Sequence, residues 1–188
     1  LIDLKRDAVC LHMCWGGEVY DVWHVCISMV NFTNNSIQSP ALPAMLNSYE
    51  NSTADLELIL TSNNITQLLP NLFAGFGINI QPELVYYPGV YLKLQRNPLV
   101  KIASTAFCAG NAGYVGFIDL DLTGCAPVEV PSTLQFESLF TTCTHFTIDM
   151  SNTGMHASIL NRFADQPCTT LIADMTRNGI TNVTHLLG

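Results

Sequence analysis

An alternation of apolar and polar residues through the middle of the chain is the feature that most limits its fold. Val90, Leu92 and Leu94 alternate with polar or aromatic residues, and the runs Ile118–Leu122 and Phe146–Met150 repeat the pattern. Turn-forming Pro, Gly and Asn residues separate the runs. Successive side chains of a strand point to opposite faces, so a period of two predicts half-buried strands. We expect an antiparallel meander with one apolar and one solvated face.

Segments with helical spacing flank this meander. Ahead of it, apolar residues recur every three or four positions in Ile65–Leu72, and after it they do so in Met155–Phe163 and Leu171–Met175. This spacing predicts amphipathic helices. One further short helix is expected around Ala41–Tyr49. The expected fold class is therefore α+β, a twisted antiparallel β-meander packed against flanking amphipathic helices. We find no internal repeat.

The length of 188 residues predicts one domain, residues 1–188. Within it we expect an N-terminal hairpin over residues 1–30, turned by Gly16-Gly17. A glycosylated loop region follows over residues 31–64. Residues 65–188 hold a helix, the β-meander and C-terminal helices.

Charged residues are scarce and mostly acidic. They make up 12% of the chain, with 15 acidic against 7 basic residues and a net charge of −8. A nucleic-acid-binding surface needs a basic stripe to displace counterions, so no nucleic-acid partner is expected. The longest apolar stretches are interrupted by Pro, Glu and Asp, so no transmembrane segment is predicted.

N-glycosylation sequons are more frequent than the about two that chance gives in this composition. They begin at Asn31, Asn34, Asn51, Asn64 and Asn182. The chain starts at Leu1 without a cleavable signal-like segment, so a signal peptide would already be removed or was never included. We expect a secreted protein, or one exposed on an extracellular surface, with glycans at these asparagines.

The seven cysteines fit disulfide bonds in an oxidising compartment. We predict the disulfides Cys108–Cys125 and Cys143–Cys168, because both close loops of moderate size. The other three, Cys10, Cys14 and Cys26, leave one cysteine unpaired, which a protein partner could use.

Metal binding is the strongest alternative for the N-terminal cysteines. Cys10, His12 and Cys14 share one strand face, and zinc prefers such ligands. A two-residue hairpin turn, however, places His24 and Cys26 on the opposite face. We therefore predict disulfides and no metal site or cofactor.

Catalytic motifs are not found in the sequence. It contains no Gly-x-Ser-x-Gly, His-Glu-x-x-His or phosphate-binding loop. Asp119 and Asp121 could act as a carboxylate pair, but strand alternation already explains them as solvent-facing residues. No catalytic residues are predicted, and we do not expect an enzyme.

The stretch Leu60–Leu122 has a helix-like segment with Leu-Leu-Pro, strands interrupted by proline and a long hairpin. Together with FTIDMSNTGMHASILNRFADQP, it resembles one barrel of the bactericidal/permeability-increasing, lipopolysaccharide-binding and cholesteryl-ester-transfer family. This resemblance implies a twisted antiparallel sheet beside a helix, with acyl chains between them. The residues it places along the ligand are Ile65, Leu68, Leu69, Leu72, Phe73, Ile159, Leu160 and Phe163.

Two functions follow as expectations. The first is an extracellular glycoprotein that binds or presents a hydrophobic ligand without catalysis. An uncharged or zwitterionic lipid is expected, because the clustered cations of the endotoxin-binding family members are missing. The alternative is a surface or envelope glycoprotein ectodomain that mediates protein recognition or receptor binding, through a glycan-free patch or an unpaired cysteine.

Overall fold

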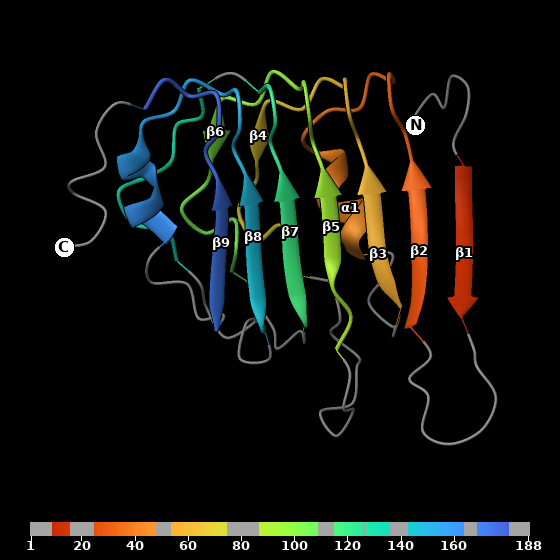
Figure 1. Cartoon of the computed structure of the whole chain (residues 1–188). Coiled ribbons are helices and arrows are strands. Elements are labelled where there is room, and N and C mark those ends of the chain that lie inside the picture. The colour runs from red at the N-terminus through yellow and green to blue at the C-terminus, as the bar shows by residue number, and fades with distance from the viewer. Residues whose placement is uncertain are drawn as a thin grey trace.

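The computed structural model describes residues 9–15, 25–47, 54–74, 87–108, 115–125, 127–135, 143–163 and 169–180. These residues form a seven-stranded sheet in the order β1-β2-β3-β5-β7-β8-β9, with a two-stranded sheet of β4 and β6 behind it (Figure 1). The strands are β1 Val9–Trp15, β2 Val25–Asn31, β3 Asp55–Ile59, β4 Gln67–Leu68, β5 Val90–Lys93, β6 Lys101–Ile102, β7 Phe117–Asp121, β8 His145–Asp149 and β9 Thr170–Asp174. The helices are α1 Ala41–Asn47 and the 3-10 helix η1 Ala157–Phe163.

The large sheet is mostly parallel, so the predicted antiparallel meander is wrong. From β2 to β9, every neighbouring pair of strands runs parallel. The strands expected at Val90–Leu94, Ile118–Leu122 and Phe146–Met150 are present, but all three point the same way (Figure 1). Parallel neighbours need a connection of a dozen residues or more, and the segments between these runs are long enough to provide it. The alternation of apolar and polar residues is the same in parallel and antiparallel strands, so it does not show in which direction a strand runs.

The chain is a solenoid of repeats, each made of one strand and a return segment behind the sheet (Figure 1). Leu58, Leu92, Leu120, Ile148 and Ala173 pair with one another in register across the strands. The step is 28 residues from Leu92 to Leu120 and again from Leu120 to Ile148. The expectation of no internal repeat is therefore also wrong.

A ladder of buried polar side chains closes the turn after each of these strands. Asn97 Nδ2 donates to the carbonyls of Leu60 and Leu94, both at 2.8 Å, and its Oδ1 accepts from the Ile65 amide at 3.0 Å. Asn63 and Asn178 make equivalent bonds from the same position in their own repeats. Asn63 donates to the Leu60 carbonyl and accepts from the Ile37 amide, and Asn178 donates to the Met150 carbonyl and accepts from the Thr153 amide. The pattern Leu-x-Leu-x-x-Asn is present at Leu58–Asn63 and Leu92–Asn97, and Ala173–Asn178 keeps its spacing with Ala and Met in place of the leucines.

Most of the predicted helices are not formed. A helix is present at α1, close to the predicted Ala41–Tyr49. In place of a helix over Ile65–Leu72 the chain has β4 and turns, and in place of one over Leu171–Met175 it has β9. The segment Met155–Phe163 contains only the 3-10 helix η1. Return segments must bury a residue every third or fourth position, and this produces helical spacing without a helix.

The core lies between the large sheet and the return segments. The rings of Phe73, Phe107, Phe146 and Phe163 are fully buried and run through several repeats. Phe107 lies 6.1 Å from Phe73 and 5.4 Å from Phe146 between ring centroids, and Phe146 lies 5.8 Å from Phe163. These aromatic contacts connect return segments with one another and with β8, and they favour one cooperative core.

At the N-terminal end of the sheet, β1 and β2 pair antiparallel, while the residues expected to form the hairpin turn lie outside the described residues. The register of β1 and β2 places Cys14 opposite Cys26, whereas a two-residue turn at Gly16-Gly17 would place Cys14 opposite Val19. The argument that put Cys26 on the face opposite to Cys14 therefore does not hold. None of the helices in the described part of the chain has the length and hydropathy of a membrane span.

Candidate functional site

One face of the large sheet is not covered by any described helix or strand, because α1, β4, β6 and the return segments lie behind it (Figure 1). We call it the open face. Its residues alternate with the buried core positions, and each is at least partly exposed. They form three rows across the strands: Asn31, Ile59, Lys93, Asp121, Asp149 and Asp174; Met29, Glu57, Tyr91, Asp119, Thr147 and Ile172; and Phe117, His145 and Thr170.

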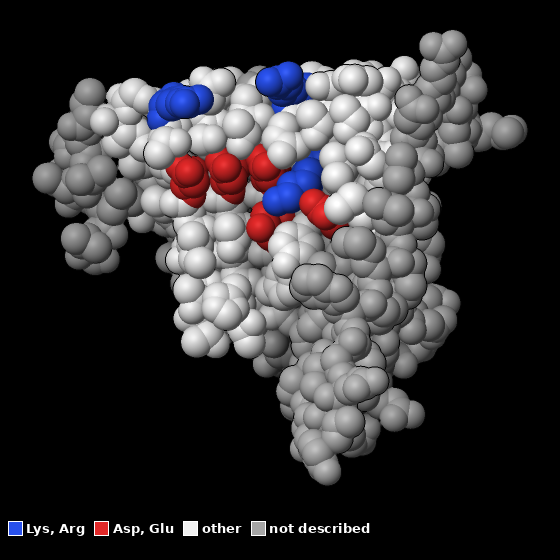
Figure 2. All heavy atoms as spheres, turned by 45° about the vertical axis from the view of Figure 1, so that its right-hand side comes forward, with Lys and Arg blue, Asp and Glu red and all other residues white. Residues whose placement is uncertain are grey.

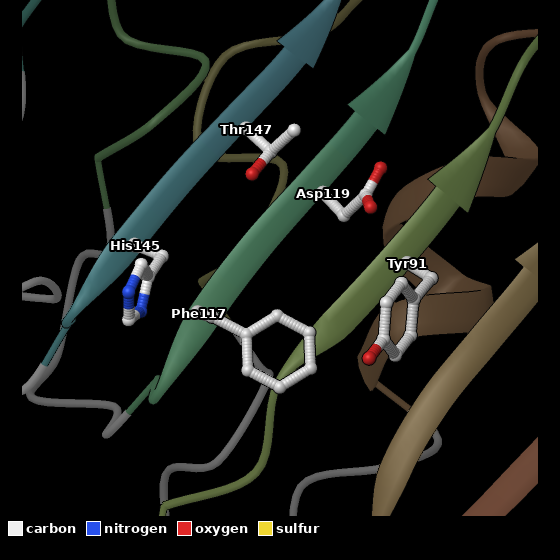
Figure 3. A pocket seen from close by; sticks show the side chains of 5 residues that line it. All are labelled: Tyr91, Phe117, Asp119, His145 and Thr147. Carbon is white, nitrogen blue, oxygen red and sulfur yellow. The ribbon is translucent and has the colours of Figure 1, made fainter. Parts of the chain in front are cut away.

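A hollow of about 240 Å³ opens on this face, across β5, β7 and β8. We call it the aromatic hollow, and its lining residues are Tyr91, Phe117, Asp119, His145 and Thr147 (Figure 3). The Tyr91 and Phe117 rings meet edge to face, with centroids 4.8 Å apart and planes at 64°. The hollow thus combines two aromatic rings with a carboxylate, an imidazole and a hydroxyl group.

Gly89 allows the Phe117 ring to lie across the start of β5. A Cβ atom at Gly89 would come within 2.1 Å of the Phe117 ring, so no larger residue fits while the ring keeps this position. The Gly89 amide donates to Asp55 Oδ1 at 2.7 Å, which fixes the backbone at this point. The shape of the aromatic hollow is therefore set by a glycine next to it as well as by its own lining.

A cation of the chain itself lies at the edge of the aromatic hollow. Lys93 Nζ is 3.2 Å from Asp119 Oδ1 and 5.7 Å from the centroid of the Tyr91 ring. The Lys93 and Asp119 side chains are 23% and 27% exposed, so water screens this ion pair and it stabilises the fold little. The geometry shows that this position accommodates an ammonium group between a carboxylate and a ring.

Acidic side chains lie around Tyr91 at the hollow. The pKa of Tyr91 is raised above its usual value, first by burial and then by the charges of Asp55, Asp119 and Glu57. The shift moves ionisation of the phenol still further from physiological pH, so its hydrogen is available for donation. Figure 2 shows acidic side chains gathered on the sheet, with a basic one among them.

Three aspartates lie next to one another in one row of the open face. Asp121, Asp149 and Asp174 are in register, and the Oδ1 atom of each accepts the backbone amide two residues further on, at 3.0, 2.8 and 2.7 Å. Asn31 makes the same bond at 2.9 Å on β2. A neutral side chain thus closes the same turn, so the turn itself does not require the three charges.

The residues that the lipid-binding resemblance implied lie in the core rather than at the hollow. Ile65, Leu68, Leu72, Phe73 and Phe163 are completely buried. Ile159 and Leu160 are partly buried and pack against the same core, and Leu69 is half-buried. The return segments direct these side chains inward, where they contact the apolar face of the sheet.

The predicted Cys108–Cys125 disulfide is not formed, because both cysteines are free and buried. Each thiol lies near a backbone carbonyl, Cys108 Sγ 3.2 Å from Gln135 and Cys125 Sγ 3.3 Å from Leu94. Cys125 occupies the ladder position that Asn97 has one repeat earlier.

Burial raises the pKa of Cys125 to about 11, so the thiol stays protonated at neutral pH. Cys143 is disulfide-bonded, while its predicted partner Cys168 lies outside the described residues. The pairing of Cys143 with Cys168 therefore remains a prediction.

Of the predicted glycosylation sites, Asn34 is exposed in a turn and Asn64 is exposed at an isolated bridge with Gln38, whereas Asn31 is half-buried at the end of β2. Asn51 and Asn182 lie outside the described residues. Asn34 and Asn64 do not belong to the open face, so glycans there would leave its central strands accessible. Glycosylation itself remains a prediction.

No metal site is found in the part of the chain that the structure describes, where no three His, Cys, Asp or Glu side chains are placed to hold an ion. The side chains of Cys10, His12, Cys14 and Cys26, and all of His24, lie outside that part. Asp119 and Asp121 both lie on the open face, as expected, but Asp119 pairs with Lys93 and Asp121 accepts from Gln95 and Thr123.

Sequence analysis missed Tyr91, Phe117, His145 and Thr147. The signal that could have identified them is their position in the repeat. Each is a partly or fully exposed strand residue that is followed directly by a buried core residue: Leu92, Ile118, Phe146 or Ile148. Alignment of the strands by their repeat would have brought these residues side by side.

No known protein family, curated protein or solved structure matches this chain. The comparisons therefore neither support nor refute the resemblance to the bactericidal/permeability-increasing protein family.

Proposed function

We propose that this protein is a non-catalytic extracellular recognition domain that binds a protein partner through the open face. The observation that carries the proposal is the aromatic hollow near the middle of a sheet face that no described helix or strand covers. Solenoid proteins use such continuous surfaces for binding. Buried aromatic anchors near the centre of a surface contribute most of the binding free energy in protein complexes.

The lipid-binding alternative has less support. Five of its eight proposed lining residues fill the core completely, which leaves no room for an acyl chain beside them. The aromatic hollow is smaller than the roughly 300–1,000 Å³ of ordinary small-molecule sites and contains a carboxylate. Such a hollow accommodates one side chain of a partner better than an acyl chain.

The proposed location outside the cell depends on the sequons. Asn34 and Asn64 are accessible to a glycosyltransferase, and neither belongs to the open face. Glycans at these two positions would hydrate a chain that has few charges and would leave the central strands of the open face free. Peptide mapping after glycosidase treatment in heavy water measures which of the five sites carry a glycan, and unmodified asparagine at all of them contradicts secretion.

Selection of short random peptides displayed on yeast, with the whole chain as the soluble target, tests the proposed surface. Thr147→Arg places a bulky cation in the aromatic hollow, and Ser104→Arg makes the same change at an exposed site in a return segment. We expect the enriched peptides to lose at least about tenfold in affinity for Thr147→Arg and less than about twofold for Ser104→Arg. Circular dichroism confirms that both variants are folded. Peptides that respond to Ser104→Arg instead would contradict the proposal.

A further inference from the structure

We infer that the partner of the open face presents a basic segment, one arginine or lysine side chain of which enters the aromatic hollow. This inference rests on the proposed function and specifies the chemistry of the partner. It follows from the lining of the hollow, from the position of Lys93 and from the charge of the surrounding face.

The lining of the hollow suits a cation with an apolar stem. The rings of Tyr91 and Phe117 offer apolar surface along the stem and a negative ring face to the charged group. Asp119, which lies across from Tyr91 on the neighbouring strand, adds a carboxylate beside these rings (Figure 3). Arginine and lysine side chains combine such a stem with a charged head, so they match both parts of the lining.

Lys93 demonstrates this recognition within the chain. Its ammonium group lies beside Asp119 and near the Tyr91 ring, at the edge of the hollow. Because the pair is partly exposed, its replacement by an external cation would cost little. An incoming arginine could also contact the carboxylate with two parallel hydrogen bonds, which a lysine cannot form.

The face around the hollow has the complementary charge. Among its described residues, the carboxylates are Glu57, Asp119, Asp121, Asp149 and Asp174, and Lys93 is the one lysine or arginine. A surface of this sign attracts and orients a basic segment and repels an acidic one. An apolar partner would remove these carboxylates from water without supplying an opposite charge, which is unfavourable.

The peptide selection described above also tests the partner chemistry. Among peptides that depend on Thr147, we expect arginine and lysine to be enriched over the starting library. Replacement of the basic residue by norleucine should weaken a selected peptide by at least about tenfold. Peptides that depend on Thr147 without basic enrichment would overturn this inference and leave the proposed function standing. Peptides that bind elsewhere would overturn both.

Two charge variants test the role of the hollow directly, with a selected basic peptide as the probe. Asp119→Asn removes one charge in the hollow, and Glu129→Gln removes one from an exposed site in a return segment, so the net charge changes equally. We expect about a fivefold or greater loss for Asp119→Asn and less than about twofold for Glu129→Gln. Equal losses would show that only net charge matters and would overturn the inference.

The Lys93→Met variant tests the inference by an expected gain in peptide affinity instead of a loss. It removes the internal cation that competes for Asp119 and makes the face more negative. We expect this variant to bind the basic peptide about threefold or more tightly. A variant that merely damages the fold would bind more weakly, so a gain separates recognition from stability. Unchanged or weaker binding by a folded Lys93→Met variant would overturn the inference.

Discussion

Asn97 shows how single polar residues hold the repeats together. It is 2% exposed. Its side chain accepts a hydrogen bond from one backbone amide and donates to two backbone carbonyls, and these groups belong to two successive repeats. We expect Asn97→Ala to lower the free energy of unfolding by about 3 kcal/mol or more, because three buried backbone groups lose their partner. Asn97→Cys should cost less, since Cys125 fills the equivalent position with one bond. Urea denaturation measures both, and an equal loss for the two variants would contradict this account.

Cys125 gives the chain a specific response to alkaline pH. Its pKa is raised to about 11 in the folded protein by burial, from the ordinary value of 9.0. Above pH 9 the unfolded chain therefore releases a proton that the folded chain still holds, so the stability that the neutral thiol provides falls as pH rises from 9 to 11.

The stability of Cys125→Ala should accordingly decline less steeply over this interval than that of the native chain, by an amount on the order of 2 kcal/mol at pH 11. Chemical denaturation at several pH values between 8 and 11 measures the difference. Cys108→Ala is the matched control, because it also removes a free buried thiol. Parallel pH profiles for native protein and Cys125→Ala would refute the assignment.

Among the elements, the β5 strand depends on the glycine that precedes it. In Gly89→Ala, the added Cβ would overlap the Phe117 ring, so the ring must leave its place beside Tyr91. We expect a loss of about 1–3 kcal/mol in stability and a loss of peptide binding. Adding Phe117→Ala to Gly89→Ala should restore part of the stability, and a double-mutant cycle measures this coupling. Strictly additive losses would contradict the contact.

The sequence predicted the positions of strands better than their directions. The alternation around Leu92, Leu120 and Ile148 located β5, β7 and β8, because only burial on one face is needed for that pattern. Strand direction depends on where the connection runs, and the return segments carried a misleading helical spacing. The site was missed for the same reason, since Tyr91 and Phe117 become neighbours only when β5 and β7 are parallel and in register.

For the whole molecule, the repeat was obscured because its most distinctive position varies. Asn63, Asn97 and Asn178 occupy the ladder, but Cys125 and Thr153 replace asparagine in the intervening repeats. A thiol or hydroxyl can bond a neighbouring carbonyl, so the turn survives the change. The turn requires one buried side chain that can form a hydrogen bond, and Asn, Cys and Thr all meet this requirement.

A solenoid should also lose protection gradually from its centre to its ends, because each repeat contacts only its neighbours. Ile118 and Leu120 of β7 are completely buried, whereas Leu171 and Ala173, which occupy the same positions in β9, are only partly buried. We expect native-state hydrogen exchange to be slowest for amides of β5 and β7 and distinctly faster for those of β9. Leu120→Ala should speed exchange across the central strands and cost about 2–5 kcal/mol, while Leu171→Ala should affect β9 and little else. Protection of β9 equal to that of β7 would contradict the gradient and would mean that the outer edge of the sheet is as well packed as its centre.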